Sequence, residues 1–92
     1  MEVKRKHIRV TGSVQGVGFR YTSSQCAKKI GVTGWVRNDY DGSVEMEVQG
    51  TDIQINTLFE MIKNASSYIY IENIESKTIP VIKNDVGFEI KY

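Results

Sequence analysis

The segment from Val10 to Arg20 combines three glycines and an arginine at a change from a strand pattern to a helix pattern. Gly12, Gly16 and Gly18 permit backbone angles that residues with a Cβ resist, so successive N–H groups can point into one concavity and form a nest for an anion. The N–H donors at the start of the helix would add to this nest, and the planar guanidinium of Arg20 matches phosphate oxygens. These residues predict a small phosphate site.

The same pattern also occurs in turns that only connect a strand to a helix. A Walker A loop would need Gly-Lys followed by Ser or Thr at the helix start, and the segment lacks it. The dinucleotide fingerprint needs its glycine spacing together with a later acidic residue, and the two are not both present. A ligand bound here should therefore be one phosphoryl group rather than a nucleotide.

Length and composition narrow the possible partners. We expect residues 1–92 to form a single domain with one modest core. A net charge of +1 gives no global field to attract nucleic acid or anionic lipid, so we expect neither as a partner. The one cysteine, Cys26, cannot form an internal disulfide, and no CxxC or Cys/His cluster predicts a metal. Without a secretion signal or a membrane-spanning run, the chain is predicted to be cytoplasmic. No sequence feature sets the oligomeric state, so a monomer is the default expectation.

The apolar pattern indicates how the chain positions the glycine segment. Gly31 is a plausible helix stop, and Thr51 with Gln54 fits a capping box. The parity of apolar residues slips near Glu72-Asn73, which suggests a β-bulge. The expected elements are a strand over Lys4–Thr11, a helix over Tyr21–Ile30, a hairpin of Trp35–Asp39 with Ser43–Gln49, a helix after Thr51, a strand over Tyr68–Ile79 and a short strand from Phe88 to Tyr92.

Two alternating patterns predict which side chains are buried. In the second hairpin strand, Val44, Met46 and Val48 should be buried, while Glu45, Glu47 and Gln49 should face water. The second helix carries apolar residues at helical spacing: Ile55, Leu58, Phe59 and Ile62. The run Tyr68-Ile69-Tyr70-Ile71 is interpreted as part of a core strand.

This order of elements is βαββαβ with an extra terminal strand. It predicts an α+β fold, a ferredoxin-like sandwich in which two helices cover one face of an antiparallel sheet. A right-handed crossover would lay the first two strands parallel, so their C-terminal ends would share one edge of the sheet. The glycine segment and Asn38, at the end of the second strand, can therefore meet at one site.

Two motifs in the chain resemble the signatures of the acylphosphatases. The first, Gly-x-Val-Gln-Gly-Val-x-Phe-Arg, runs from Gly12 to Arg20. The second joins Gly34-Trp35-Val36-Arg37-Asn38 to Gly42-Ser43-Val44 and then Gly50. Both motifs are intact and in the expected order, and the similarity extends over essentially the whole chain.

The resemblance implies an enzyme that hydrolyses acyl phosphates, which are carboxyl-phosphate mixed anhydrides, to carboxylate and inorganic phosphate without a metal or cofactor. Arg20 matches the family's phosphate-binding arginine, and Asn38 matches the asparagine that orients the attacking water. The backbone amides of Gln15, Gly16, Val17, Gly18, Phe19 and Arg20 are then expected to hold the phosphoryl oxygens of the substrate, of inorganic phosphate or of another anion.

Several other residues have simpler interpretations. We expect the Gln15 side chain to brace the loop, Arg37 to be a solvated charge and Cys26 to be a small core residue. His7 is not expected to be catalytic. Asp39 and Asp41 could form a carboxylate pair, but their setting beside Gly42 favours a structural role in the hairpin.

Two other functions share this predicted fold. An accessory module that binds phosphate or carbamoyl phosphate without catalysis is the main alternative, because acylphosphatase-like domains also occur in larger carbamoyl-transfer maturation proteins. The lack of a flanking domain, together with the presence of Arg20 and Asn38, favours an enzyme. An RNA-binding module would need stacked aromatic residues in a basic surround on the central strands, where this sequence places His7, Arg9, Glu45 and Glu47.

Overall fold

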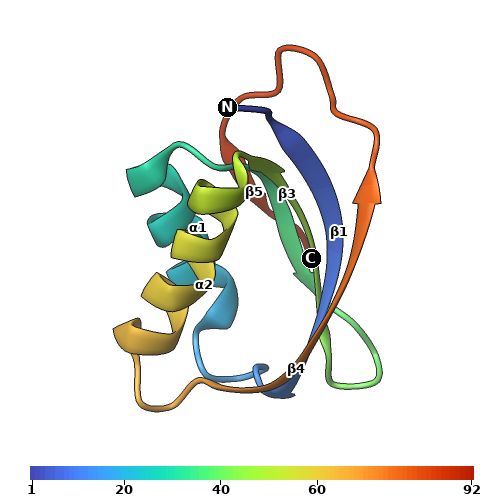
Figure 1. Cartoon of the computed structure of the whole chain (residues 1–92). Coiled ribbons are helices and arrows are strands. Elements are labelled where there is room, and N and C mark those ends of the chain that lie inside the picture. The colour runs from blue at the N-terminus through green and yellow to red at the C-terminus, as the bar shows by residue number, and fades with distance from the viewer.

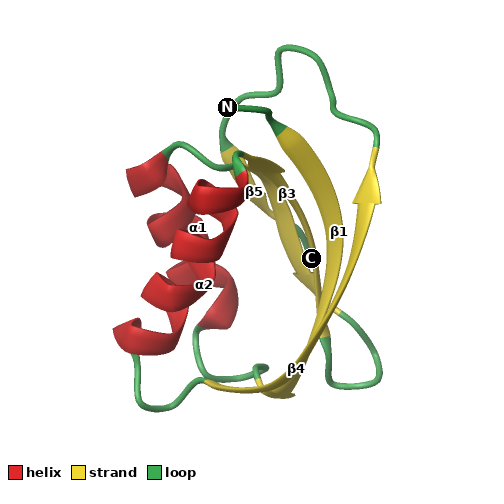
Figure 2. Cartoon of the chain, in the orientation of Figure 1, coloured by secondary structure: helices red, strands yellow, loops and turns green.

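Two helices pack on one face of a five-stranded sheet in the computed structural model, which describes residues 1–92 (Figure 1). The helices form one layer and the sheet forms the other (Figure 2). The elements are β1 (Lys4–Ser13), α1 (Phe19–Ile30), β2 (Thr33–Asn38), β3 (Val44–Gly50), α2 (Asp52–Ala65), β4 (Tyr70–Ile79) and β5 (Phe88–Ile90).

The order of the strands explains why two distant segments meet. The sheet runs β4-β1-β3-β2-β5, and β3 is antiparallel to both β1 and β2. Strands β1 and β2 are therefore parallel to each other, as predicted, and their C-terminal ends lie at the same edge. The first four strands form the expected antiparallel sheet. Strand β5 adds a parallel partner to β2, so the complete sheet is mixed.

The core lies between the sheet and the helices. On β3, Val44, Met46 and Val48 are fully buried, as the alternation predicts. Helix α2 begins with the predicted capping box: the Gln54 backbone N–H donates to Thr51 Oγ1, and the Thr51 backbone N–H donates to Gln54 Oε1. The residues that α2 buries are the four predicted ones: Ile55, Leu58, Phe59 and Ile62.

Two expectations about burial were wrong. Gln49 is buried rather than exposed, because the loop between β4 and β5 covers it: its side chain donates to Ile82 O and accepts from Ile82 N. In the run expected to be core strand, Ile69 is buried but Tyr68 and Tyr70 are exposed, and β4 begins only at Tyr70. Because every residue of the run is apolar or aromatic, the sequence did not reveal that alternate side chains point to opposite faces of this edge segment.

The predicted bulge in β4 is present. Thr11 pairs with Asn73 and Gly12 pairs with Ile71, which leaves Glu72 as the extra residue. Gly12 has a φ of 129°, and a Cβ at this position would lie 2.2 Å from Tyr70 O. The edge strand thus approaches β1 too closely for any residue but glycine.

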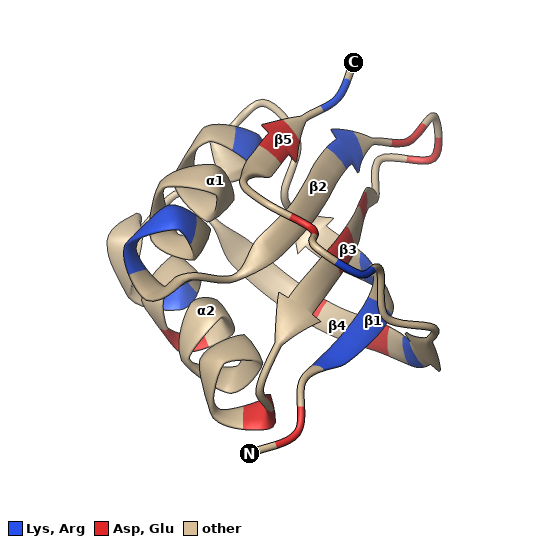
Figure 3. Ribbon diagram, turned by 90° about the horizontal axis from the view of Figure 1, so that it is seen from above, with Lys and Arg blue, Asp and Glu red and all other residues tan.

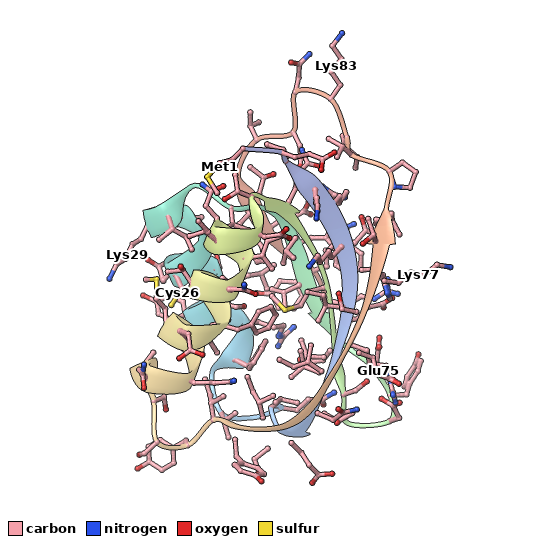
Figure 4. All side chains as sticks on the ribbon, viewed as in Figure 1. Met1, Cys26, Lys29, Glu75, Lys77 and Lys83 are labelled. Atoms are coloured by element: carbon pink, nitrogen blue, oxygen red, sulfur yellow. The ribbon has the colours of Figure 1, made fainter.

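Charged residues of both signs lie along the strands of the sheet (Figure 3). Figure 4 shows Glu75 and Lys77 projecting from β4 on the side away from the helices. Ion pairs link neighbouring strands and loops here: Arg5 with Glu47 and Asp85, His7 with Glu45, Arg9 with Asp41 and Glu75, and Arg37 with Glu45. Most of the local charge is thereby paired. Neither helix is both long and apolar enough to cross a membrane.

Replacing Gly34 by alanine tests the contact that aligns β2 with β3. Gly34 has a φ of 141°, and a Cβ there would lie 1.8 Å from Glu47 O. Backbone strain and the clash together should lower the free energy of unfolding by about 3 kcal/mol or more, measured by urea denaturation. The matched control is Gly42→Ala, where φ is 92° and no atom lies within 4 Å. It should lose only about 1–2 kcal/mol, and equal losses in the two variants would contradict the described contact.

Candidate active site

A cavity of about 250 Å³ opens at the edge where β1 and β2 end. The loop after β1, the first turn of α1, the end of β2 and the C-terminal segment all contribute to it. Its lining residues are Val14, Gly16, Gly18, Phe19, Arg20, Tyr21, Asn38, Ile90 and Tyr92. The structure thus brings together the two segments that the sheet topology predicted to meet.

The glycine loop presents its backbone to this cavity. Gly16 and Gly18 adopt left-handed backbone conformations with φ of 71° and 79°, and open space surrounds the place where a Cβ would stand. Helix α1 begins at Phe19, two residues earlier than predicted, so Arg20 belongs to its first turn. No side chain caps this end of the helix and no acidic residue lies in its first turn. Its N–H donors and its positive dipole end therefore remain available for an anion.

The side chains of three predicted phosphate-binding residues pack against the core or brace the loop and do not face a ligand. Phe19 is buried, so only its backbone can reach a ligand. Gln15 and Val17 are absent from the residues that line the cavity, and Val17 packs against the core. The Gln15 side chain is the predicted brace: its Nε2 donates to Asp39 O at 2.6 Å and to Ser43 O at 2.8 Å. These bonds fix the loop to the β2–β3 hairpin.

The guanidinium of Arg20 is held by the C-terminal segment. Its Nη1 donates to Lys91 O at 3.3 Å, and its Cζ lies 4.8 Å from the centroid of the Tyr92 ring. Arg5, Arg9 and Arg37 all pair with carboxylates, but Arg20 does not. It therefore keeps an uncompensated positive charge beside the free helix N–H groups. Sequence analysis missed Tyr92, because no local pattern connects the last residue of the chain with Arg20.

Asn38, which lines the cavity, has an unusual polar atom. Its Oδ1 is the one buried side-chain nitrogen or oxygen in the structure that has no hydrogen-bond partner. An amide oxygen in this state can accept a hydrogen bond from a ligand or from a bound water. Asn38 also lines a neighbouring hollow of about 780 Å³, together with Gln15, Arg37, Asp39, Tyr40 and Tyr92.

The hairpin beside Asn38 is stabilised by Asp41. Its Oδ1 accepts hydrogen bonds from the backbone N–H of Ser43 at 3.0 Å and from Ser43 Oγ at 2.6 Å. These bonds and the nearby Arg9 hold the pKa of the Asp41 carboxyl well below its ordinary value of 3.8. Arg37 pairs with Glu45 and Asp39 on the far face of the sheet from the helices. Asp41 thus has the structural role that its setting predicted.

The two other candidates for nucleophilic or acid–base chemistry lie outside the cavity. His7 pairs with Glu45 on the strand face opposite the helices. Cys26 is buried on α1 (Figure 4), and burial raises the pKa of its thiol. No group of three or more His, Cys, Asp or Glu side chains is arranged so that it could hold a metal ion. What the cavity offers is a set of preorganised donors, one unpaired cation and one unpaired amide oxygen.

The family model described as Acylphosphatase matches residues 6–90 of the chain. The chain belongs to the acylphosphatase family. An acylphosphatase of Bifidobacterium longum is 45% identical over 78 residues, which cover 85% of this chain and 80% of that one. The crystal structure of the acylphosphatase from Bacillus subtilis is similar over 99% of this chain and 100% of that chain, with 33% identity and a TM-score of 0.85.

A further likeness places the same domain inside a larger protein. The crystal structure of T. kodakarensis HypF is similar over 97% of this chain but only 12% of that one, with 34% identity and a TM-score of 0.81. None of the comparisons favours a non-catalytic module for this chain. The protein is thus an acylphosphatase, an enzyme that hydrolyses small-molecule acyl phosphates to carboxylate and inorganic phosphate.

The Asp41→Asn variant should reveal the contribution of the hairpin carboxylate through its pH dependence. Because the folded state lowers the pKa of Asp41, the charged form stabilises the fold at pH values above about 4, where the unfolded chain is also ionised. Wild type should therefore be more stable than the variant at neutral pH. As the pH falls below about 4, protonation favours the unfolded chain and the difference should shrink. Urea denaturation of both proteins at several pH values measures it, and a difference that does not vary with pH would contradict the assignment.

Proposed function

We propose that this acylphosphatase acts by direct attack of water on a phosphoryl group held by the loop from Gln15 to Arg20, without a metal or cofactor. The water oxygen forms a bond to phosphorus while the bond between phosphorus and the acyl oxygen breaks. The carboxylate leaves with the electron pair of that bond, and a proton of the water goes to a phosphate oxygen. The observation that carries this proposal is the unpartnered Oδ1 of Asn38, a residue that lines the same cavity as Arg20.

In this proposal the loop and Arg20 bind the phosphoryl group. Phosphoryl transfer needs positioning and stabilisation of charge on the three equatorial oxygens, with little covalent chemistry from the protein. Backbone N–H groups of the loop and of the first turn of α1 supply fixed donors, and Arg20 supplies a charge that no carboxylate neutralises. Preorganised donors of this kind need no rearrangement as the charge develops.

Asn38 is proposed to hold the attacking water. Its Oδ1 can accept a hydrogen bond from the water and so fix the direction of a water lone pair towards phosphorus. The cavity contains no histidine, aspartate or glutamate that could act as a general base. An acyl phosphate has a good leaving group, so a strong base is not required, and a phosphate oxygen of the substrate is proposed to take the proton.

The state in which the enzyme works is also a proposal. We infer that residues 1–92 act as one domain, because a single cluster of 17 buried apolar residues draws on both helices and on all strands except β4. Activity as a monomer is proposed as the default state of the chain. The cytoplasmic location stays a prediction from the sequence.

Replacing Arg20 by alanine should weaken both phosphate binding and turnover. Loss of a comparable preorganised donor raises the activation free energy by about 3 kcal/mol, so kcat/KM for benzoyl phosphate should fall on the order of a hundredfold or more. The inhibition constant of inorganic phosphate should rise as well. Arg37→Ala is the matched control, because it removes an arginine that is paired with Glu45 on the other face of the sheet. Similar losses in both variants would show that overall charge, rather than the Arg20 site, matters.

Asn38→Ala should separate catalysis from binding and from stability. We expect hydrolysis of benzoyl phosphate, assayed in EDTA, to fall on the order of a hundredfold or more, while inhibition by inorganic phosphate stays nearly unchanged. The free energy of unfolding should be equal or slightly higher, since the change removes a buried oxygen that has no partner. Full activity of this variant would disprove the water-positioning role. If wild type bound phosphate without turnover in EDTA, the proposed metal-independent mechanism would be wrong.

A further inference from the structure

Two hollows meet at Asn38 and Tyr92. The phosphate cavity and the neighbouring hollow share only these two residues. Tyr21 lines the phosphate cavity alone, whereas Tyr40 lines the neighbouring hollow alone. Asn38 therefore stands at the boundary between two spaces, each of which has its own exposed tyrosine.

The geometry of the reaction decides which space receives the acyl group. The attacking and leaving oxygens lie roughly in line on opposite sides of phosphorus. With the water at Asn38, the leaving oxygen faces away from the boundary between the hollows. The acyl group then extends into the part of the phosphate cavity that the neighbouring hollow does not share, which Tyr21 lines.

We propose that Tyr21 forms a subsite for the acyl group and that this subsite favours flat aromatic acyl groups over small aliphatic ones. This inference rests on the proposed function, because it uses the position of the water. Tyr21 follows Arg20 in the first turn of α1 and is 66% exposed, so its ring is open to a substrate. A second aromatic ring can stack on it in an offset or edge-to-face arrangement.

The remaining lining of this space agrees with an uncharged acyl group. Apart from Arg20, which the phosphoryl group engages, the residues that line only this cavity carry no charge. Ile90 offers a partly exposed apolar side chain, whereas the Val14 and Phe19 side chains are buried and contribute only their accessible backbone. An acyl group with a second carboxylate would find no cation of its own here, whereas a benzoyl group would meet apolar atoms and the Tyr21 ring.

The test compares kcat/KM for benzoyl phosphate with kcat/KM for acetyl phosphate in four proteins: wild type, Tyr21→Ala, Tyr21→Phe and Tyr40→Ala. Comparing the ratio between proteins cancels the intrinsic reactivity of each anhydride. In Tyr21→Ala the ratio should fall roughly three- to tenfold, the size expected when one aromatic contact is lost. Tyr21→Phe keeps the ring and should keep the ratio, and Tyr40→Ala should keep it as well, since Tyr40 lines only the other hollow.

Each result has one meaning. A ratio that does not change in Tyr21→Ala would overturn the subsite while leaving the proposed function intact. A selective fall in Tyr40→Ala would also overturn it, because the acyl group would then extend into the neighbouring hollow. Wild-type protein that hydrolysed neither substrate would overturn the proposed function and the subsite together. Undiminished turnover in Asn38→Ala would remove the position of the water, and with it the inference about Tyr21.

Discussion

The two hydrogen bonds from Gln15 Nε2 to the backbone oxygens of Asp39 and Ser43 hold the halves of the site together. One half is a loop that leaves β1, and the other is the hairpin that follows β2, so nothing local in the sequence fixes their distance. Sheet topology brings the ends of β1 and β2 to one edge, but β3 separates them. The Gln15 side chain spans this gap with both of its N–H donors. The register of loop and hairpin, and hence the distance from Arg20 to Asn38, depends on it.

With the loop and the hairpin joined in this way, the proposed catalysis consists almost wholly of positioning the phosphoryl group and the attacking water. The enzyme brings no histidine, aspartate or glutamate side chain to the cavity, so in the proposed mechanism its contribution comes from donors and a charge that are fixed before the substrate arrives. Such preorganisation has a cost in stability. A buried oxygen without a partner, such as Asn38 Oδ1, destabilises a fold by about 1–3 kcal/mol. The proposed mechanism explains why this oxygen has no partner in the folded protein: it gains a hydrogen bond only during the reaction, from the attacking water.

Much of this arrangement was predictable from the sequence because it follows from local chemistry. The capping box at Thr51, the stop at Gly31 and the alternation from Val44 to Val48 each depend on residues a few positions apart, and all three are present. The predictions from the sequence failed where segments that are far apart along the chain interact. Gln49 alternates like a surface residue but lies beneath the loop after β4, whose course no short pattern encodes. The meeting of glycine loop and Asn38 was predictable only because the handedness of the crossover is nearly fixed.

Within the site itself, the C-terminal segment is another place where contacts between distant residues, rather than a local sequence pattern, determine the structure. The Lys91 backbone N–H donates to Val36 O, while Lys91 O accepts from Arg20 Nη1. One residue therefore links the guanidinium to β2, two positions before Asn38. Strand β5 is short, but because it runs parallel to β2, both strands end at the same edge of the sheet. Lys91 follows β5 and therefore lies at this edge. An antiparallel strand would have ended at the opposite edge. The Arg20 guanidinium is thus linked through Lys91 to the strand that carries Asn38, and this second link acts together with the Gln15 hydrogen bonds to set the relative position of the two residues.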